Sequence, residues 1–134
     1  MKTSRILVVD DNSSVSEIVS SFLRQSGRYE LRIENNSTWA AAVAREFRPD
    51  LAILDVDRPD QDGGEVALEF KSDPILKDIT LIFMSGLISA EDKGFRDGVV
   101  YLPRSLPLAT LERVVEIVLT GHLSAGREPT VTVI

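Results

Sequence analysis

The chain has 134 residues, of which 43% are hydrophobic and 27% charged, a length and composition that suit one globular domain with its own core. Its 15 Lys and Arg against 21 Asp and Glu give a formal net charge of −6, with no basic cluster, which argues against direct binding to nucleic acid. No cysteine is present and there is one histidine, which excludes disulfides and thiolate sites and leaves almost nothing for a histidine-based triad.

Hydropathy along the chain gives no sign of a membrane segment. No apolar run approaches the length that spans a bilayer, and the first residues lead straight into a predicted strand instead of a signal peptide. We therefore expect a cytoplasmic protein with no membrane partner.

Five apolar runs of strand length recur, with helix-length segments between them. They cover residues 6–9, 29–33, 51–54, 79–84 and 99–102. Continuous apolar runs are typical of parallel strands buried on both faces, and their alternation with helices predicts βα units. We expect an α/β fold with a doubly wound, five-stranded parallel sheet in the order 2-1-3-4-5 and the first and last helices on one side.

The helical segments differ in the strength of their periodicity. The clear ones begin at Asn12 or Ser13, around Trp39, near Gly63 or Gly64, and around Leu108. The first two are predicted to bury Val15, Ile18, Val19, Phe22 and Leu23, and Trp39, Ala40, Val43, Ala44 and Phe47. The segment after Ser85 is interrupted by Gly94, so a short or frayed helix is expected there.

The predicted domain covers residues 1–121, and residues 122–134 form a C-terminal tail that is too short for a second domain. The end of this tail alternates between polar and apolar residues over 129–134. It is expected to be either disordered or an extra strand at a sheet edge.

Three aspartates close two of the apolar runs. Asp10 and Asp11 follow the first run and Asp55 follows the third. Ligands of open parallel sheets bind outside the carboxyl ends of the strands, so these side chains are expected at one edge. Two like charges 4 Å apart repel by about 4 kcal/mol at an effective dielectric of 20, and such a site favours a hard cation, with Mg²⁺ the natural occupant. The alternative is that each aspartate only ends a strand or caps a helix.

These aspartates belong to a longer ordered pattern, with Pro59, Asp62-Gly63, Ser85, Tyr101 and Arg104 at later strand ends and turns. In this order the chain resembles the receiver domain of two-component response regulators, over residues 6 to about 119. The resemblance implies a flavodoxin-like, CheY-like fold and a phosphorelay function.

The resemblance also implies a role for each matching residue. Asp55 would be the phosphoacceptor, and Asp10 or Asp11 with Asp55 and the backbone carbonyl of Asp57 would bind Mg²⁺. Ser85 would hydrogen-bond the phosphoryl group, and Tyr101 would report the movement of the Ser85 loop. From position alone, Ser85 is equally an ordinary strand-end serine and Tyr101 equally a half-buried core tyrosine.

The chain departs from the family where Arg104-Ser105 replaces the usual Lys-Pro. Arg104 keeps the positive charge and would serve as counter-charge to a phosphoryl group on Asp55, but it presents a wider planar fork. The span from Ser85 to Arg104 is also short, consistent with a trimmed fourth helix.

The implied partners are a sensor histidine kinase or a histidine phosphotransfer protein as donor, and a downstream protein or output domain; a homodimer is left open. The chain would not be an enzyme beyond Mg²⁺-dependent self-phosphorylation and autodephosphorylation at Asp55.

The alternative is a pseudo-receiver, an interaction module independent of phosphorylation. A phosphohydrolase reading of Asp55 and Asp57 is disfavoured, because in the dehalogenase-like enzymes that pair follows the first strand.

Overall fold

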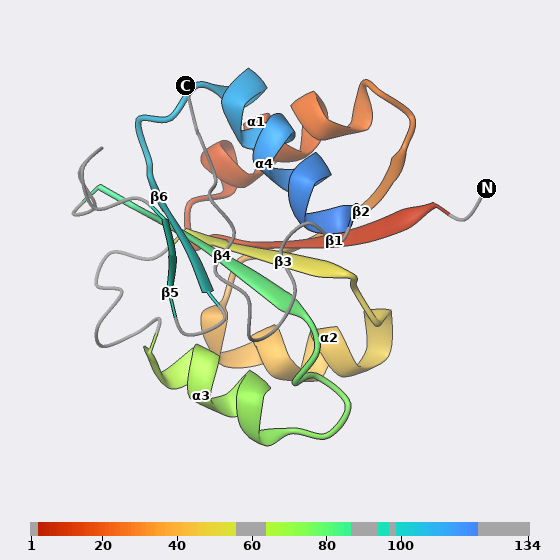
Figure 1. Ribbon diagram of the computed structural model, residues 1–134, viewed down its shortest axis with the longest axis vertical. Coiled ribbons are helices and arrows are strands. Elements are labelled where there is room, and N and C mark those ends of the chain that lie inside the picture. The colour runs from red at the N-terminus through yellow and green to blue at the C-terminus, as the bar shows by residue number, and fades with distance from the viewer. Residues whose placement is uncertain (1–2, 56–63, 87–93, 97–98, 121–134) are drawn as a thin grey trace.

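A computed structural model describes residues 3–55, 64–86, 94–96 and 99–120. Five parallel strands, β1 (Ser4–Val9), β2 (Tyr29–Glu34), β3 (Leu51–Asp55), β4 (Thr80–Ser85) and β6 (Val99–Pro103), are joined at one edge by β5 (Gly94–Arg96). The order is β2-β1-β3-β4-β6-β5, and β5 pairs with β6 in the antiparallel direction (Figure 1). The predicted parallel order 2-1-3-4-5 is therefore confirmed, with β6 as its fifth strand.

Helices cover both faces of the sheet. On one face lie α1 (Ser13–Arg24) and α4 (Leu108–Leu119), and on the other lie α2 (Ala40–Phe47) and α3 (Gly64–Ser72) (Figure 1). A short 3₁₀ turn, η1 (Ser37–Trp39), leads into α2. The first and last helices share a side, as expected.

The alternation of side chains along each central strand builds two separate cores. In β1, Ile6 and Val8 face α1 and α4, whereas Leu7 and Val9 face α2 and α3. All four are at most 2% exposed. Because both faces of β1 and β3 are covered, their sequences read as unbroken apolar runs.

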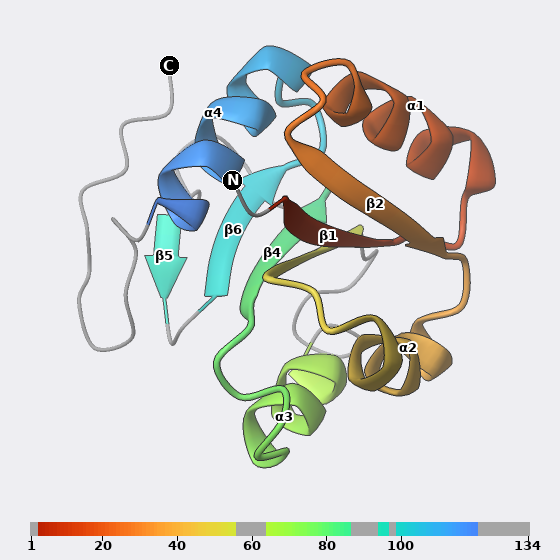
Figure 2. The same cartoon turned by 90° about the vertical axis from the view of Figure 1, so that its right-hand side faces the viewer.

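The prediction of a short or frayed helix after Ser85 is wrong for residues 94–96, the part of this segment that the structure describes. Gly94–Arg96 forms β5, a strand that pairs with Val99–Tyr101 of β6 (Figure 2). Gly94 has φ +150°, which is far from helical and accessible to glycine. The strand satisfies backbone groups on the outer side of β6, which an interrupted helix would leave unpaired. Residues 87–93 and the tail at 122–134 lie outside the described residues.

Two predicted core residues are exposed. Ile18 on α1 is 58% exposed, because the buried stripe of that helix consists of Ser16, Val19, Ser20 and Leu23. Trp39 is 57% exposed and belongs to η1 instead of α2. Periodicity correctly identified both helices but overestimated the width of the buried faces.

The helix ends follow from local chemistry. The side chain of Asn12 accepts hydrogen bonds from the backbone N–H groups of Ser14 and Val15, at 3.0 and 3.3 Å, and so caps α1. At the end of α2, Arg48 adopts the left-handed conformation, and its backbone N–H donates to the Ala44 carbonyl. None of the helices in the described residues is both long enough and apolar enough to span a membrane.

Arg48 provides a test of the α2 terminus. Its φ of 55° is costly for a residue with a Cβ, so Arg48→Gly is expected to be about 1 kcal/mol more stable than Arg48→Ala. Urea unfolding of the two variants measures this difference. The matched control is Gln25, which ends α1 at φ −59°: there glycine should be less stable than alanine. The same order at both positions would contradict the account.

Candidate functional site

The candidate site lies where four neighbouring parallel strands end. Asp10 directly follows β1, Asp55 ends β3, Ser85 ends β4 and Arg104 directly follows β6. The register aligns these ends, since Val9 pairs with Leu54 and Asp55 with Met84. The sheet thus brings together residues separated by up to 94 positions, as the sequence predicted for this edge.

Hydrogen bonds hold the loop that carries Asp10 and Asp11. The carboxylate of Asp10 accepts the backbone N–H of Asn12 at 2.9 Å. The side-chain amide of Asn35, just after β2, donates to the Asp10 carbonyl at 2.8 Å and to the Ser16 hydroxyl at 3.2 Å. Asn35 was not identified from the sequence, because no strand-end motif marks it; it ties β2, the Asp10 loop and α1 together.

Asp10 and Asp11 differ in environment. Asp10 is 4% exposed, whereas Asp11 is exposed. The pKa of Asp10 is raised to about 6. Burial is the largest cause, and the nearby charges of Asp55 and Asp11 raise the pKa further, whereas the hydrogen bond from the Asn12 N–H and the charge of Arg104 lower it. A buried carboxylate with like charges beside it is suited to a cation.

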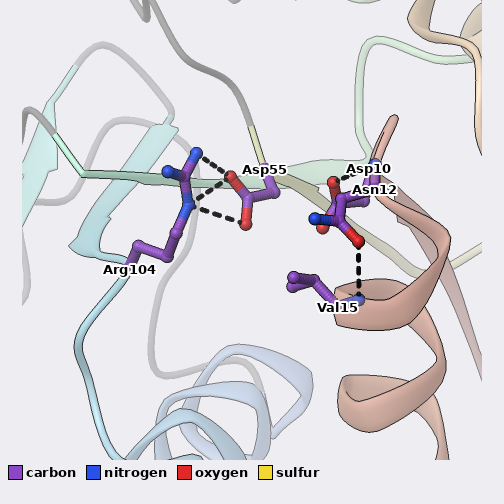
Figure 3. Close-up of polar contacts among 5 residues, drawn as sticks. All are labelled: Asp10, Asn12, Val15, Asp55 and Arg104. Atoms are coloured by element: carbon purple, nitrogen blue, oxygen red, sulfur yellow. Dashed lines mark hydrogen bonds and ion pairs between the residues drawn. The ribbon is translucent and has the colours of Figure 1, made fainter.

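In the structure the cation at Asp55 is Arg104. Its Nε donates to both carboxylate oxygens of Asp55, at 2.9 and 3.1 Å, and its Nη2 lies 2.5 Å from one of them (Figure 3). The Asp55 side chain is 9% exposed and that of Arg104 is 40% exposed. The sequence predicted Arg104 as a counter-charge for a phosphoryl group; here it pairs directly with the carboxylate.

Ser85 ends β4 at the same carboxyl edge of the sheet, and Tyr101 lies in the middle of the neighbouring strand β6. Ser85 is fully buried, and its carbonyl accepts the backbone N–H of Arg104 at 3.0 Å. Tyr101 is half-buried and packs edge-on against Phe83, with ring centroids 5.7 Å apart. Their switch roles stay predictions. Asp57, Pro59 and Asp62-Gly63 lie outside the described residues.

The acidic side chains at this edge match the implied Mg²⁺ in the type of their ligand atoms. Carboxylate oxygens from Asp10, Asp11 and Asp55 are the hard ligands that Mg²⁺ prefers, and the charges of Asp55 and Asp11 add to the burial that raises the pKa of Asp10. Within the described residues, however, no three acidic or histidine side chains are arranged closely enough to hold a metal. The residues fit the ion in kind, and Arg104 already donates hydrogen bonds to both oxygens of Asp55.

The pKa of Asp10 predicts a pH-dependent stability. Because the folded-state pKa of about 6 exceeds the ordinary 3.8, the folded protein binds more protons than the unfolded chain between these values, and stability falls as the pH rises through that range. Asp10→Asn should therefore be more stable than wild type at pH 7, by roughly 1–2 kcal/mol after allowance for solvent screening. The gain should shrink from pH 6 to pH 4 in urea unfolding with EDTA. A pH-independent difference would contradict the assignment.

Comparison with known proteins agrees with this geometry. A family model described as the response regulator receiver domain matches residues 6–96, so Tyr101 and Arg104 lie beyond the match. The chain is 32% identical over 96 residues to the DNA-binding dual master transcriptional regulator RpaA of Synechocystis, covering 70% of this chain and 39% of that protein. It is also 32% identical over 108 residues to a probable cyclic di-GMP phosphodiesterase of Vibrio cholerae, covering 77% of this chain and 24% of that protein. It thus spans less than half the length of these relatives.

Solved structures give the same fold. The receiver domain of the hybrid histidine kinase CckA is 29% identical with a TM-score of 0.69, covering 87% of this chain and 99% of the other. The chemotaxis response regulator CheY4 of Vibrio cholerae, 23% identical, has a TM-score of 0.71 with coverage of 87% and 99%. With the ordered strand-end residues and the parallel 2-1-3-4-5 sheet, these matches show that the chain belongs to the response regulator receiver domain family of two-component signalling, with a CheY-like fold.

Proposed function

We propose that this chain accepts a phosphoryl group on Asp55 from a phosphohistidine of a sensor histidine kinase or a histidine phosphotransfer protein. The observation that carries the proposal is the position of Asp55, a nearly buried carboxylate at the carboxyl end of β3, between the acidic β1 end and Arg104. One Asp55 oxygen attacks phosphorus in line while the phosphorus–nitrogen bond of the donor breaks and the imidazole leaves. The product is an acyl phosphate.

The residues around Asp55 would divide the remaining tasks. Asp10 or Asp11, together with Asp55 and the backbone carbonyl of Asp57, would hold Mg²⁺, which when bound neutralises charge on the transferring oxygens. Arg104 would donate charge-assisted hydrogen bonds to the phosphoryl group after transfer. Ser85 would donate its hydroxyl proton to a phosphoryl oxygen, and Tyr101, two strands from β3, would respond to the shift of that loop.

The signal would pass to a downstream protein or output domain through protein contacts, and a homodimer is one form that the contact can take. The coverage of the relatives supports this view, because the match covers only 39% of RpaA and 24% of the probable cyclic di-GMP phosphodiesterase. The name of RpaA describes a DNA-binding regulator, but the net charge of −6 argues against that role for the present chain.

One observation favours a second function. The ion pair between Arg104 and Asp55 already neutralises the phosphoacceptor, as a pseudo-receiver that acts independently of phosphorylation would tolerate. The two functions differ in whether Asp55 can be modified at all.

Modification of Asp55 is the primary test. Incubation with acetyl phosphate and Mg²⁺ should add one phosphoryl group, detected by mass spectrometry, and EDTA should prevent it. Asp55→Asn should abolish the addition because no carboxylate nucleophile is left. Asp78→Asn is the matched control, since Asp78 is exposed and lies at the opposite, amino end of the sheet. Failure of wild type to react with either acetyl phosphate or beryllofluoride would replace the proposal by the pseudo-receiver.

A second test addresses Mg²⁺ itself. Asp10→Asn and Asp11→Asn should each raise the dissociation constant for Mg²⁺ at least about tenfold, because each removes charge from a small oxygen-ligand site. Isothermal titration of both variants and wild type measures the effect, again with Asp78→Asn as control. Equal affinities in all four proteins would remove the acidic residues from the metal site.

A further inference from the structure

The outer side of β2 is a long sheet edge. β2 comes first in the order of the sheet, and no strand among the described residues pairs with its outer side (Figure 2). It pairs with β1 over all six of its positions without a bulge, and it contains neither Pro nor Gly. A regular edge of this kind is a template for pairing with a further strand. β5, at the opposite edge, has only three residues.

The bonds to β1 show which backbone groups of β2 point outward. The carbonyl of Glu34 accepts the backbone N–H of Asp10 at 3.0 Å, so the backbone groups of Glu34 point toward β1. Along a strand of a parallel pair these groups alternate in direction from one residue to the next, so those of Glu30 and Arg32 also point toward β1. The residues whose N–H and C=O groups point away from β1 are Tyr29, Leu31 and Ile33.

The side chains of β2 alternate between apolar and charged. The apolar ones pack under α1 and α4 but stay half-buried; they are Tyr29, Leu31 and Ile33. On the other face, Glu30 pairs with Arg5 and Arg32 pairs with Glu46, at 3.2 Å in each case. The side chains of these four residues are between 39% and 72% exposed. Exposed ion pairs hold their partners weakly, so Glu30 and Arg32 are available to further charges.

In the antiparallel direction, β2 is complementary to itself. Two copies that pair about a two-fold axis at Leu31 bring their outward backbone groups together, with Tyr29 opposite Ile33 of the second copy. Glu30 then lies opposite Arg32 of the second copy on each side of the axis. In the two neighbouring registers that keep the outward groups paired, Glu30 meets Glu30 or Arg32 meets Arg32. Because like charges opposite one another are unfavourable, the charges select one register.

We propose that β2 is a self-association surface, at which two copies of this chain pair edge to edge and join their sheets. The pairing forms about six backbone hydrogen bonds, since each of the three pairs of outward residues exchanges two. It covers the half-buried apolar side chains of β2 and connects the ion pairs of Glu30 and Arg32 across the two copies. Such a dimer requires no phosphoryl group on Asp55 and so goes beyond the proposed function.

Two single variants test the charge pairs. Glu30→Arg and Arg32→Glu each place like charges opposite one another in the homodimer. Each should raise the dissociation constant of the homodimer about tenfold or more, because two attractive cross-strand pairs become repulsive. A mixture of the two variants restores opposite charges at both positions, so it should form a heterodimer about as tight as the wild-type homodimer. Sedimentation equilibrium of each protein and of the mixture measures these constants.

The heterodimer also guards against a trivial cause. Each variant loses one ion pair within its own copy, with Arg5 or with Glu46, and this loss is the same in the mixture as in the single proteins. The matched controls are Lys77→Glu and Asp78→Arg, which change the net charge by the same amounts. Both residues are exposed and precede β4, three strands away from β2 in the sheet. Both controls should dimerise like wild type.

Hydrogen exchange locates the contact on the strand. The amide groups of Leu31 and Ile33 should gain protection as the protein concentration rises, because they bond the second copy. The amide groups of Glu30 and Arg32 bond β1 in the single copy already and should change less.

Three results would overturn the dimer. They are a wild-type chain that stays monomeric up to about 1 mM, a mixture of the two variants that associates no better than either alone, and protection of Leu31 and Ile33 that does not depend on concentration. The last result would mean that another part of this chain, such as residues 129–134, covers the edge. None of these results bears on phosphoryl acceptance, because the reaction of Asp55 with acetyl phosphate is measured separately.

Discussion

The main physical constraint on this site is the electrostatic repulsion between carboxylates that the parallel sheet brings to one edge. Asp10 directly follows β1 and Asp55 ends β3, and the register of these adjacent strands places both residues at the same carboxyl edge. Their charges contribute to the raised pKa of Asp10. A fold that converges negative charge in this way needs a positive partner at the same edge. Arg104, which follows β6 two strands away from β3, supplies it.

The ion pair between Arg104 and Asp55 joins the ends of β3 and β6. Arg104 also acts on the neighbouring carboxylate, because its charge opposes the rise in the pKa of Asp10. Because the Arg104 backbone is bonded to Ser85, movement of the arginine also acts on the end of β4. The site and the loops around it are thus mechanically connected through a few hydrogen bonds.

The edge beside β6 sets this domain apart from a regular alternation of strands and helices. β5 pairs with β6, and Gly94 lies opposite Tyr101, the residue expected to report switching. Tyr101 also packs on Phe83 in the core. A strand at this position places backbone hydrogen bonds next to Tyr101 where a helix was expected, so the surface formed around β6 differs from the one that the resemblance implied.

The sequence by itself determined the parallel sheet, its order and the acidic edge. Continuous apolar runs report burial on both faces, and strand-end aspartates must meet because parallel strands share a carboxyl edge. Only the tertiary structure decided that Ile18 and Trp39 are exposed, that Gly94–Arg96 is a strand, that Asn35 holds the Asp10 loop and that Gly86 lies against Arg104. These features depend on contacts between residues distant in the chain, such as Asn35 with Asp10 and Gly86 with Arg104, which local periodicity and propensity do not encode.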